Sequence, residues 1–551
     1  MSASHKKQLR KEQKAAQMTE KQQAEQKEAK KLRLYTILFT VAIALMVCIV
    51  IFTTVTASGI IERNTTAVTV DGTKISAVEL NYYYIDGLNN YLNQWGDYIS
   101  LSGLDTTKAL DEQTFDADAG TTWADYFLDL ATDNIHSVYS AYNKAVAEGY
   151  TLSEEDAAAI DSTLSSMELY GLYYYGYSDL NSYLEAMYGN GANEKSYRAY
   201  AEAQYIASAY ANDYYESLSY TDEEIAAVLA ENPNAFTSYS YNYYYLSSAS
   251  FLEGGTTDDE GTITYSDEEK AASVTACKEA ADSLMAQADT IHSVVLLDKA
   301  IKGLDINADS ADAASTAVAD RMYTDLSATL KEWISDEARV EGELGCVPYE
   351  TESTDADGNT VTTVNGYYLV LFLGSNDNTY LMNNVRHILV AFEGGTTDDA
   401  GNTTYSDEEK AAALAEAEEI LASYKAGEMT EEAFTALALE HSDDVDSNGN
   451  VNNEGLYENI IPSSEYVENF LNWAIDDART PGETGIVETE YGYHVMYFVG
   501  DSEQSYRDYL ITEQLRSEDL TAWETALTDA AVITVKNTSK VRTDLTLSSG
   551  S

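Results

Sequence analysis

The hydrophobic pattern opens with one long uncharged stretch. Residues 34–61, LYTILFTVAIALMVCIVIFTTVTASGII, hold no charged side chain over 28 positions. A helix of about 20 apolar residues spans a bilayer, so this stretch predicts a single transmembrane helix that anchors the chain. A cleaved signal peptide is the alternative because TVTASG offers small residues, although its apolar region would be unusually long.

Charge on either side of this stretch predicts its orientation. Residues 1–33 hold ten Lys or Arg and four Glu, a net of +6, whereas the rest holds 22 basic and 89 acidic residues, a net of −67. The positive-inside tendency predicts a cytoplasmic tail at 1–33 and a single-pass protein of the cell membrane with its bulk outside. Such an acidic body repels nucleic acid and anionic surfaces. Basic partners or solubility alone would equally explain the acidity.

Helical periodicity dominates residues 62–236. AVTVDGTKIS predicts a small hairpin with its turn at Asp71-Gly72. The Ala- and Tyr-rich helices after it carry the start signals LSEEDAAAI and YTDEEIAAVL. Residues 502–551 have the pattern of a helix ending in a strand, which we expect to join this helical domain. The tyrosine-rich segment 168–189 is either a contact surface for unfolded chains or ordinary core, and periodicity cannot choose between them.

An internal repeat follows the helical region. EGGTTDDEGTITYSDEEKAA (253–272) matches EGGTTDDAGNTTYSDEEKAA (393–412) at 17 of 20 positions, an offset of 140. The same offset relates WISDEARVEGELG to WAIDDARTPGETG, and GYYLVLFLG matches GYHVMYFVG after an insertion in the first copy. Each copy has the pattern of a strand, an acidic loop, helices and a closing strand. We therefore predict two α+β domains of one plan, at 237–376 and 380–501.

The elements of the second copy can be located individually. RHILVAF predicts a strand, Ser406 with Glu409 makes a capping box before a helix, and Thr430 caps the next helix. VENFLNWAI predicts a third, short helix, and ETGIVETEYGYHVMYFVG predicts a tight pair of strands. Alternation along the last strand puts His494 on the same face as Met496. A histidine that faces a core needs a hydrogen-bond partner.

Two of the six histidines, His387 and His494, stand in the first and last strands of this copy. Around them RHILV, FTALALEHSDD, GLYE, YVENFLNWAI and PGETGIVETEYGYHV resemble a parvulin-type peptidyl-prolyl cis–trans isomerase domain over about 384–500. The wider arrangement resembles the PrsA/SurA class of extracytoplasmic foldases. The resemblance implies an α+β protein with an N-terminal transmembrane helix, a helical SurA-N-like chaperone domain and two parvulin-like domains, the first degenerate.

The resemblance also implies roles for single residues. His387 and His494 match the family's central histidines, Asp444 matches the residue that faces the substrate amide, and Thr489 matches the threonine that bonds the histidines. The proline ring would enter an apolar pocket made by Leu456, Tyr466 and Phe470. Tyr466 stands where the family usually has methionine, and the family's glycine-rich loop is shortened to NNEGLYE. The chemistry implied needs no cofactor.

These residue types suit rotation about a prolyl bond. Resonance sets a barrier of about 18–20 kcal/mol, and uncatalysed exchange takes about 10–100 s. An apolar pocket that holds the ring, with polar groups that favour the twisted amide, lowers this barrier without a nucleophile. We therefore predict a foldase for exported polypeptides that contain X-Pro bonds. The alternatives are a non-catalytic chaperone or binding protein on a parvulin scaffold, or a surface adhesion protein.

Two further patterns could bind metal or form a disulfide. DVDSNGNVNNEG, residues 444–455, nearly fits a calcium loop, but its twelfth position is Gly455 instead of Glu. We expect no metal, with calcium at this loop as the lesser alternative. Cys277 and Cys346 could form one bridge, but two buried small side chains are the simpler interpretation.

The first copy lacks the histidine pair. Tyr368 is the counterpart of His494, and a three-residue slip places Tyr244 opposite the position of His387. No acidic residue clearly replaces the one after the second helix. We therefore expect a copy without isomerase chemistry, used for binding or spacing.

Overall fold

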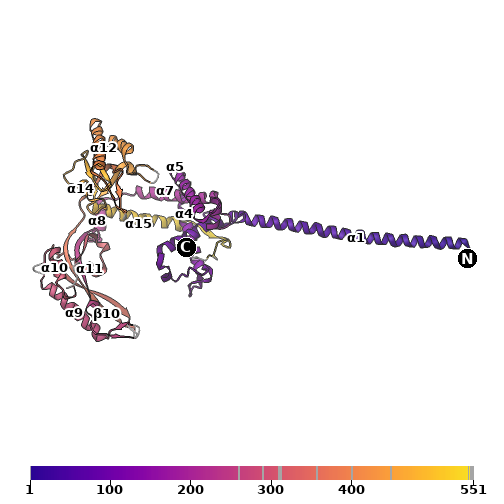
Figure 1. Ribbon diagram of the computed structural model, residues 1–551, viewed down its shortest axis with the longest axis horizontal. Coiled ribbons are helices and arrows are strands. Elements are labelled where there is room, and N and C mark those ends of the chain that lie inside the picture. The colour runs from indigo at the N-terminus through magenta and orange to yellow at the C-terminus, as the bar shows by residue number, and fades with distance from the viewer. Residues whose placement is uncertain are drawn as a thin grey trace. The chain divides into compact units, whose positions relative to one another are not determined.

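The chain divides into two compact units. One, unit 1, comprises residues 1–218 with 516–551, and the other, unit 2, comprises residues 219–515. This division groups residues 219–236 with unit 2, whereas the sequence pattern grouped them with the helical region. Figure 1 shows the elements along the chain. The computed structural model describes residues 2–258, 261–287, 291–307, 313–354, 358–398, 401–446, 449–543 and 545.

Unit 1 begins with the long helix α1 (Ala3–Ala57), followed by the short helix α2 (Ile60–Asn64). Among the described residues, Lys30–Ala57 is the one helix that is long and apolar enough to cross a membrane. The side-chain amide of Asn190 donates to the carbonyl oxygen of Thr56 at 2.7 Å. The end of the apolar helix therefore contacts a loop of the folded part of unit 1.

A three-stranded antiparallel sheet, in the order β17-β1-β2, joins the two ends of unit 1. β1 (Thr66–Val70) and β2 (Thr73–Ser76) form the predicted hairpin. Its turn residues Asp71 and Gly72 both have positive φ, 49° and 87°, as a two-residue hairpin turn requires. β17 (Ile533–Val535) pairs with β1. The C-terminal strand therefore pairs with the hairpin that opens the helical region.

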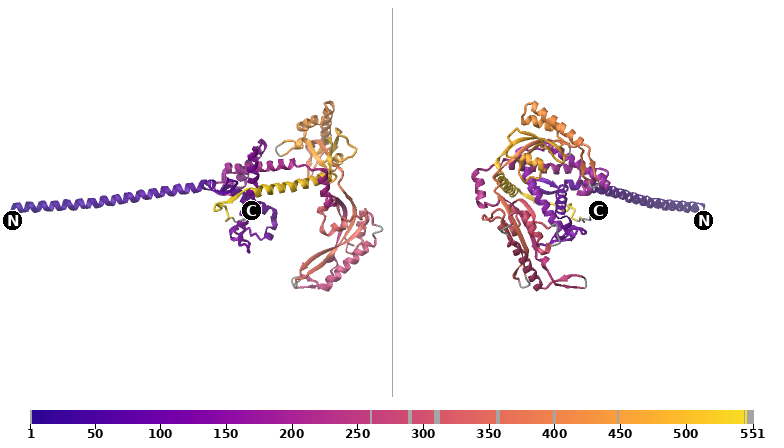
Figure 2. Two further views of the ribbon diagram at one scale, coloured as in Figure 1. Left: turned by 180° about the vertical axis from the view of Figure 1, so that it is seen from behind. Right: turned by 60° about the vertical axis from the view of Figure 1, so that its left-hand side comes forward.

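The helices of unit 1 pack around one aromatic core that includes the fully buried Tyr82, Tyr84 and Phe127. Trp523 of the returning helix α15 stacks on Tyr214 of α7 with ring centroids 4.5 Å apart, and Figure 2 shows α15 in yellow beside α7. The helices are α3 (Ala77–Trp95), α4 (Trp123–Glu148), α5 (Glu154–Tyr175), α6 (Leu180–Tyr188), α7 (Glu194–Ser217) and α15 (Tyr506–Ala530). A small hairpin, β3 (Thr114–Asp116) with β4 (Thr121–Thr122), precedes α4.

Unit 2 begins with α8 (Asp222–Glu231) and contains two antiparallel four-stranded sheets with the same plan. Their strand orders are β8-β5-β10-β9 and β14-β11-β16-β15. The two predicted repeats therefore share one α+β architecture. The strands are β5 (Ser238–Ser247), β8 (Thr316–Met322), β9 (Leu344–Thr354), β10 (Thr360–Asn376), β11 (Leu381–Ala391), β14 (Leu456–Ile460), β15 (Thr484–Glu488) and β16 (Gly492–Ser505).

Each repeat carries three α-helices among its described residues, and the first of them starts with a capping box, at Ser266 in the first copy and, as predicted, at Ser406 in the second. In both copies a two-residue hairpin, β6–β7 (Thr256–Thr257, Ile263–Thr264) or β12–β13 (Thr396–Thr397, Thr403–Thr404), precedes it. The helices are α9 (Asp267–Met285), α10 (Val294–Lys302), α11 (Ala328–Ile334), α12 (Asp407–Ala426), α13 (Glu431–His441) and α14 (Glu468–Ala474). Cys277 is buried, Cys346 is partly exposed, and both are free thiols.

The sheet of the second repeat separates two layers. On one face Ile388 and Val495 pack against α12 and α13, where Phe434 is fully buried. On the other face Met496 packs with Phe470 of α14. The alternation predicted for the last strand is confirmed, and His387 and His494 belong to this second face, where both rings lie beside Phe470.

Candidate active site

β11 and β16 bring the two histidines of the second repeat together. Leu389 lies opposite His494, and His387 lies opposite Met496, so the two imidazoles are diagonal neighbours on one face. Their Nδ1 atoms are 3.0 Å apart, and the rings are stacked with centroids 5.1 Å apart. Both side chains are buried. The central strands alone therefore create the imidazole pair.

Two residues from other segments close the ends of this pair. Oδ2 of Asp444, just after α13, is 3.0 Å from Nε2 of His387. Oγ1 of Thr489, just after β15, is 2.9 Å from Nε2 of His494. The structure thus brings all four polar residues of the sequence hypothesis into one hydrogen-bonded chain.

The carboxylate of Asp444 is the acceptor end of the chain. Besides His387, Tyr457 donates its hydroxyl to Oδ2 at 2.6 Å and Asn452 donates its side-chain amide to Oδ1 at 2.7 Å. The hydrogen bond from His387 is the main cause that holds the pKa of Asp444 well below its usual range. Burial acts in the opposite direction, but the hydrogen bonds from Tyr457 and Asn452 lower the pKa further. The group is therefore ionised and accepts only, so Nε2 of His387 carries a proton.

The two imidazoles share one hydrogen bond between their Nδ1 atoms, so one Nδ1 donates and the other accepts. Nε2 of His494 bonds to Oγ1 of Thr489, which also donates to the carbonyl oxygen of Gly492 at 3.4 Å and accepts the backbone N–H of Tyr491 at 3.3 Å. Burial, and next the neighbouring His387, lower the pKa of His494 to about 3. At neutral pH, His494 is therefore uncharged, and its ring donates one hydrogen bond and accepts one.

A cavity of about 350 Å³ lies beside this chain. Its apolar wall is Phe470, a buried ring whose centroid is 5.3 Å from His387 and 5.4 Å from His494. Tyr466 and Tyr491 line it with 37% and 58% of their surface exposed. The cavity therefore joins an aromatic recess to an ionised carboxylate. The full lining is His387, Leu389, Asp444, Tyr457, Glu465, Tyr466, Val467, Phe470, Tyr491 and His494.

Leu456 does not line this cavity, and the place assigned to it is taken by Tyr457. On β14, Leu456 pairs with Arg386 and Tyr457 pairs with Val385. Because side chains alternate along a strand, Tyr457 shares the face of His387, and their ring centroids are 4.8 Å apart. The sequence hypothesis missed Tyr457 by one residue; counting the strand alternation from His387 would have found it.

The shortened loop NNEGLYE forms the tight turn Asn452–Gly455. Asn453 and Glu454 have positive φ, 45° and 53°, and Gly455 has φ of 79°. A Cβ added to Gly455 would lie 2.6 Å from the carbonyl oxygen of His387, closer than real Cβ contacts allow. The glycine therefore lets the loop close against β11 and deliver Asn452 to the carboxylate.

The predicted calcium loop is only partly described, because residues 447–448 lie outside the described residues. Within the described part of the chain, no group of three or more His, Cys, Asp or Glu could hold a metal ion. Both carboxylate oxygens of Asp444 already accept hydrogen bonds. The prediction of no metal, with calcium at 444–455 as the lesser alternative, stays a prediction.

The first repeat has tyrosines where the second has histidines. Tyr368 lies opposite Tyr245 in the β10–β5 register, just as His494 lies opposite Leu389 in the second repeat. Tyr368 therefore occupies the position of His494, as expected. Its ring lies 4.9 Å from that of Tyr245.

The counterpart of His387 is Tyr243, and the sequence assignment of Tyr244 is wrong. His387 lies two residues before Leu389, so its counterpart lies two residues before Tyr245, which is Tyr243. The three-residue slip came from aligning the two sequences, which does not give the strand register. Tyr244 points to the opposite layer, where Asn307 donates to its hydroxyl at 2.7 Å. Tyr243 instead packs edge-on against Tyr368 with centroids 5.8 Å apart.

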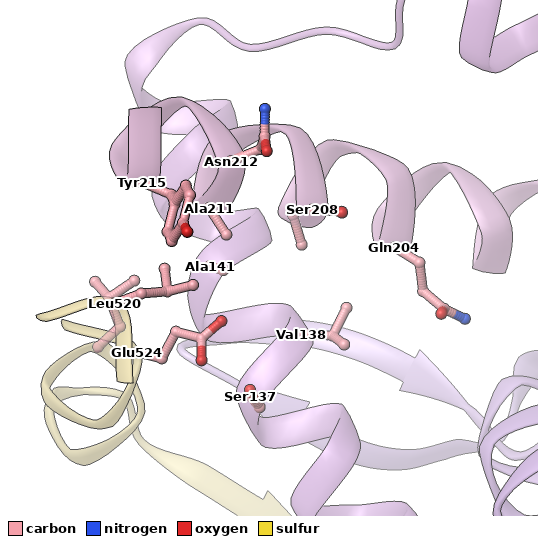
Figure 3. Close-up of a pocket in the computed structure, with 12 residues that line it drawn as sticks. Ser137, Val138, Ala141, Gln204, Ser208, Ala211, Asn212, Tyr215, Leu520 and Glu524 are labelled. Atoms are coloured by element: carbon pink, nitrogen blue, oxygen red, sulfur yellow. The ribbon is translucent and has the colours of Figure 1, made fainter. Parts of the chain in front are cut away.

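A different cavity in unit 1 contrasts with this site. A cavity of about 550 Å³ lies between α4, α7 and α15. Figure 3 shows side chains from these three helices around it. It holds mostly small side chains, and its titratable groups are Glu524 and Tyr215. It has no histidine, so it offers no counterpart to the chain of the second repeat. The residues that line it are Ser137, Val138, Ala141, Gln204, Ala207, Ser208, Ala211, Asn212, Tyr215, Leu520, Glu524 and Leu527.

The chain is similar to a known domain family over part of its length and, weakly, to solved structures. Solved structures similar to the chain include the peptidylprolyl isomerase PrsA of Bacillus anthracis (18% identity, 28% of this chain and 59% of that chain, TM-score 0.15). Another is PrsA from Bacillus subtilis (14% identity, 80% of this chain and 98% of that chain, TM-score 0.27). No curated protein matches the chain. Residues 387–500 match the family model Rotamase, the PPIC-type PPIase domain, so the second repeat is a domain of this family and the parvulin resemblance is confirmed.

Proposed function

We propose that this chain is a membrane-anchored, extracytoplasmic peptidyl-prolyl cis–trans isomerase that assists the folding of exported polypeptides. The observation that carries the proposal is an aromatic recess beside a hydrogen-bonded chain that runs through two buried histidines and ends on the ionised Asp444. Phe470 and Tyr466 offer the recess, and Asp444 offers the charge. The match of residues 387–500 to the PPIC-type family adds independent support.

Binding of the proline ring is the first task of such a site. Phe470 and Tyr466, with ring centroids 5.4 Å apart, present aromatic faces to a ring that has no charge and no N–H. Packing there removes the ring from water and fixes the position of the prolyl bond. The remaining peptide can leave through the exposed side of the cavity. No covalent intermediate is required.

Twisting the amide is the second task. A planar amide carries resonance charge, negative on oxygen and positive on nitrogen, which the twisted form loses. A carboxylate near the carbonyl oxygen destabilises the planar form relative to the twisted one, so Asp444 lowers the barrier. The histidine pair keeps the carboxylate ionised and in place. In this account His387 and His494 are positioning residues, whereas Asp444 acts on the substrate.

The location outside the cytoplasm rests on the N-terminal segment. The apolar helix Lys30–Ala57 can serve as an anchor or as a signal sequence. The basic residues before it favour a cytoplasmic N-terminus. The contact between Asn190 and the carbonyl of Thr56 would be lost on cleavage at TVTASG, which supports a retained anchor.

A direct test measures isomerisation of a short X-Pro peptide by the full chain in detergent, beside suppression of client aggregation. The proposal predicts acceleration of exchange in the peptide. A chain that suppresses aggregation and leaves peptide exchange at the uncatalysed rate would instead be a non-catalytic chaperone on a parvulin scaffold. A chelator that lowers the melting temperature would support calcium at 444–455, and no shift would remove it.

A further inference from the structure

The tyrosine-rich end of α5 has more apolar surface than the core of unit 1 can bury. The inward stripe is complete with Ile160, Leu164, Met167 and Gly171, which recur at helical spacing and are buried or partly buried. The other apolar residues of the last turns lie on the remaining faces of the helix. They form an exposed group, called here the tyrosine patch: Leu169 (54% exposed), Tyr170 (46%), Leu172 (50%), Tyr173 (77%), Tyr174 (76%) and Tyr175 (56%).

The patch is an organised surface. A Cβ at Gly171 would lie 2.8 Å from the ring of Tyr183, so the glycine lets α6 close against α5. Tyr183 then lies 6.4 Å, centroid to centroid, from both Tyr170 and Tyr175. A hollow of about 420 Å³, lined in part by Tyr170 and Tyr183, adjoins the patch. Contiguous exposed apolar surface of this kind marks binding sites on soluble proteins.

The two helices of the patch carry acidic side chains alone. From other segments, Arg198 pairs with Asp161 in the first half of α5, and Arg542 donates to the carbonyl oxygens of Ala186 and Met187 of α6. Residues 151–194, which include α5 and α6, contain no Lys, Arg or His, and their acidic residues are Glu154, Glu155, Asp156, Asp161, Glu168, Asp179, Glu185 and Glu194. Glu168, Asp179 and Glu185 are exposed. The patch also covers the C-terminal end of a helix, whose free carbonyls carry partial negative charge. Aromatic faces attract cations as well, guanidinium groups most often.

We propose that the tyrosine patch binds unfolded polypeptide segments that carry arginine or lysine beside apolar residues. The tyrosine faces and the adjoining hollow take the apolar parts and the stems of the long basic side chains. The surrounding carboxylates favour the charged ends. The assignment rests on the proposed function, since it names the class of client segment that the foldase holds apart from its prolyl site.

The test uses the full chain in nanodiscs of zwitterionic lipid and fluorescence anisotropy of a labelled, proline-free peptide rich in arginine and leucine. A second peptide has glutamate in place of each arginine. The wild type should bind the basic peptide and lose most of that binding at high salt. Tyr173→Ser with Tyr174→Ser should weaken binding about tenfold. Tyr98→Ser, at a residue 70% exposed elsewhere in unit 1, is the matched control and should leave binding unchanged.

Several results would overturn the proposal. These are equal affinity for the two peptides, unchanged binding in the double variant, or a patch whose substitution abolishes self-association in sedimentation instead of peptide binding. Isomerisation of an X-Pro peptide is measured on the same variants and should equal the wild type. Loss of the patch function is thereby distinguished from failure of the isomerase proposal.

Discussion

The two repeats of unit 2 keep the same scaffold and differ at the face where chemistry would occur. Both have the same strand order. In both, an arginine after the last helix packs over the ring of a tryptophan in that helix. Arg479 lies over the ring of Trp473 at 4.0 Å, and Arg339 lies over Trp333 at 4.2 Å. Each arginine also pairs with the glutamate four residues later. The parts that hold the fold together have been retained in both copies.

The site face has diverged in the same pair of domains. The second repeat holds a chain of polar groups that ends on Asp444, whereas the first presents packed tyrosine rings around Tyr368. Shared architecture therefore says little about shared activity, because function depends on a few side chains placed on the scaffold. Matched substitutions in the two repeats can separate the roles of scaffold and site.

The largest expected effect comes from matched core residues on the short helices. Phe470→Ala and Leu330→Ala both remove side chains that are 3% exposed, so each should destabilise its repeat, by about 4 and 3 kcal/mol respectively. Only Phe470→Ala should abolish isomerisation, because it removes the wall of the prolyl recess. The measurements are denaturant unfolding and kcat/KM on an X-Pro peptide at a temperature where both variants are folded. Equal loss of activity in both variants would refute the division of roles.

Asp444→Asn tests the charge of the second repeat's site without creating a cavity. The neutral amide keeps the size of the side chain but loses the charge that disfavours the planar substrate, so kcat/KM should fall about 100-fold. Asp305→Asn, at an exposed carboxylate after α10 of the first repeat, should change nothing. An Asp444→Asn enzyme with full activity would show that the charge is not used.

Acidification should weaken the second repeat selectively. His494 has a pKa of about 3 in the folded protein against about 6.5 when unfolded, so its stabilising contribution is complete above pH 6.5. It falls by about 1.4 kcal/mol per pH unit as the pH drops towards 3. The first repeat has Tyr368 at this position and lacks this dependence. Hydrogen exchange should show that the free energy of opening of the second repeat is lower at pH 5 than at pH 7 by about 2 kcal/mol.

Unit 1 supplies a control of opposite sign for that measurement. Burial raises the pKa of Glu79, which accepts a hydrogen bond from Tyr139, to about 7. The folded state therefore binds the proton more tightly than the unfolded chain, whose glutamates titrate near 4.3. This contribution is complete at low pH and is lost as the pH rises to 7. Equal acid sensitivity of unit 1 and the second repeat would contradict both assignments.

The smallest effect is expected at the residue that the sequence hypothesis missed. Tyr457→Phe removes one of the three side-chain donors to Asp444, and a loss of about 1 kcal/mol corresponds to about fivefold in kcat/KM. Tyr243→Phe in the first repeat is the matched control and should leave activity at the wild-type level. A Tyr457→Phe variant indistinguishable from Tyr243→Phe would show that the carboxylate is held without this hydroxyl.

Periodicity and capping signals predicted most of the second repeat correctly. Ser406 and Thr430 cap the helices expected of them, and the two histidines meet on adjacent strands. The sequence did not predict the register between neighbouring strands, which decides between Leu456 and Tyr457 and between Tyr243 and Tyr244. A repeating pattern tells which face a residue occupies within its strand but not which residue lies opposite. β11 and β14 also shift register between Asn383 and Val385, and no letter pattern marks such a shift.

Exposure was also beyond the sequence. Two tyrosine-rich segments have similar sequences, yet Tyr239 and Tyr241 of β5 are buried, whereas Tyr173 and Tyr174 of α5 are among the most exposed large hydrophobic side chains of unit 1. The difference arises because β5 is an inner strand of its sheet, while α5 extends past the core that its inward stripe contacts. Only packing with distant segments decides such cases.

The central claim is that the His387–His494 pair and Asp444 form one working site in the second repeat. Its most direct test is refolding of a protein limited by prolyl isomerisation, catalysed by the full chain. Wild type and the Tyr243→Ala, Tyr368→Ala variant of the first repeat should accelerate the slow phase equally. The His387→Ala, His494→Ala variant, shown by circular dichroism to be folded, should leave refolding near its uncatalysed rate. Full acceleration by that variant would contradict the account.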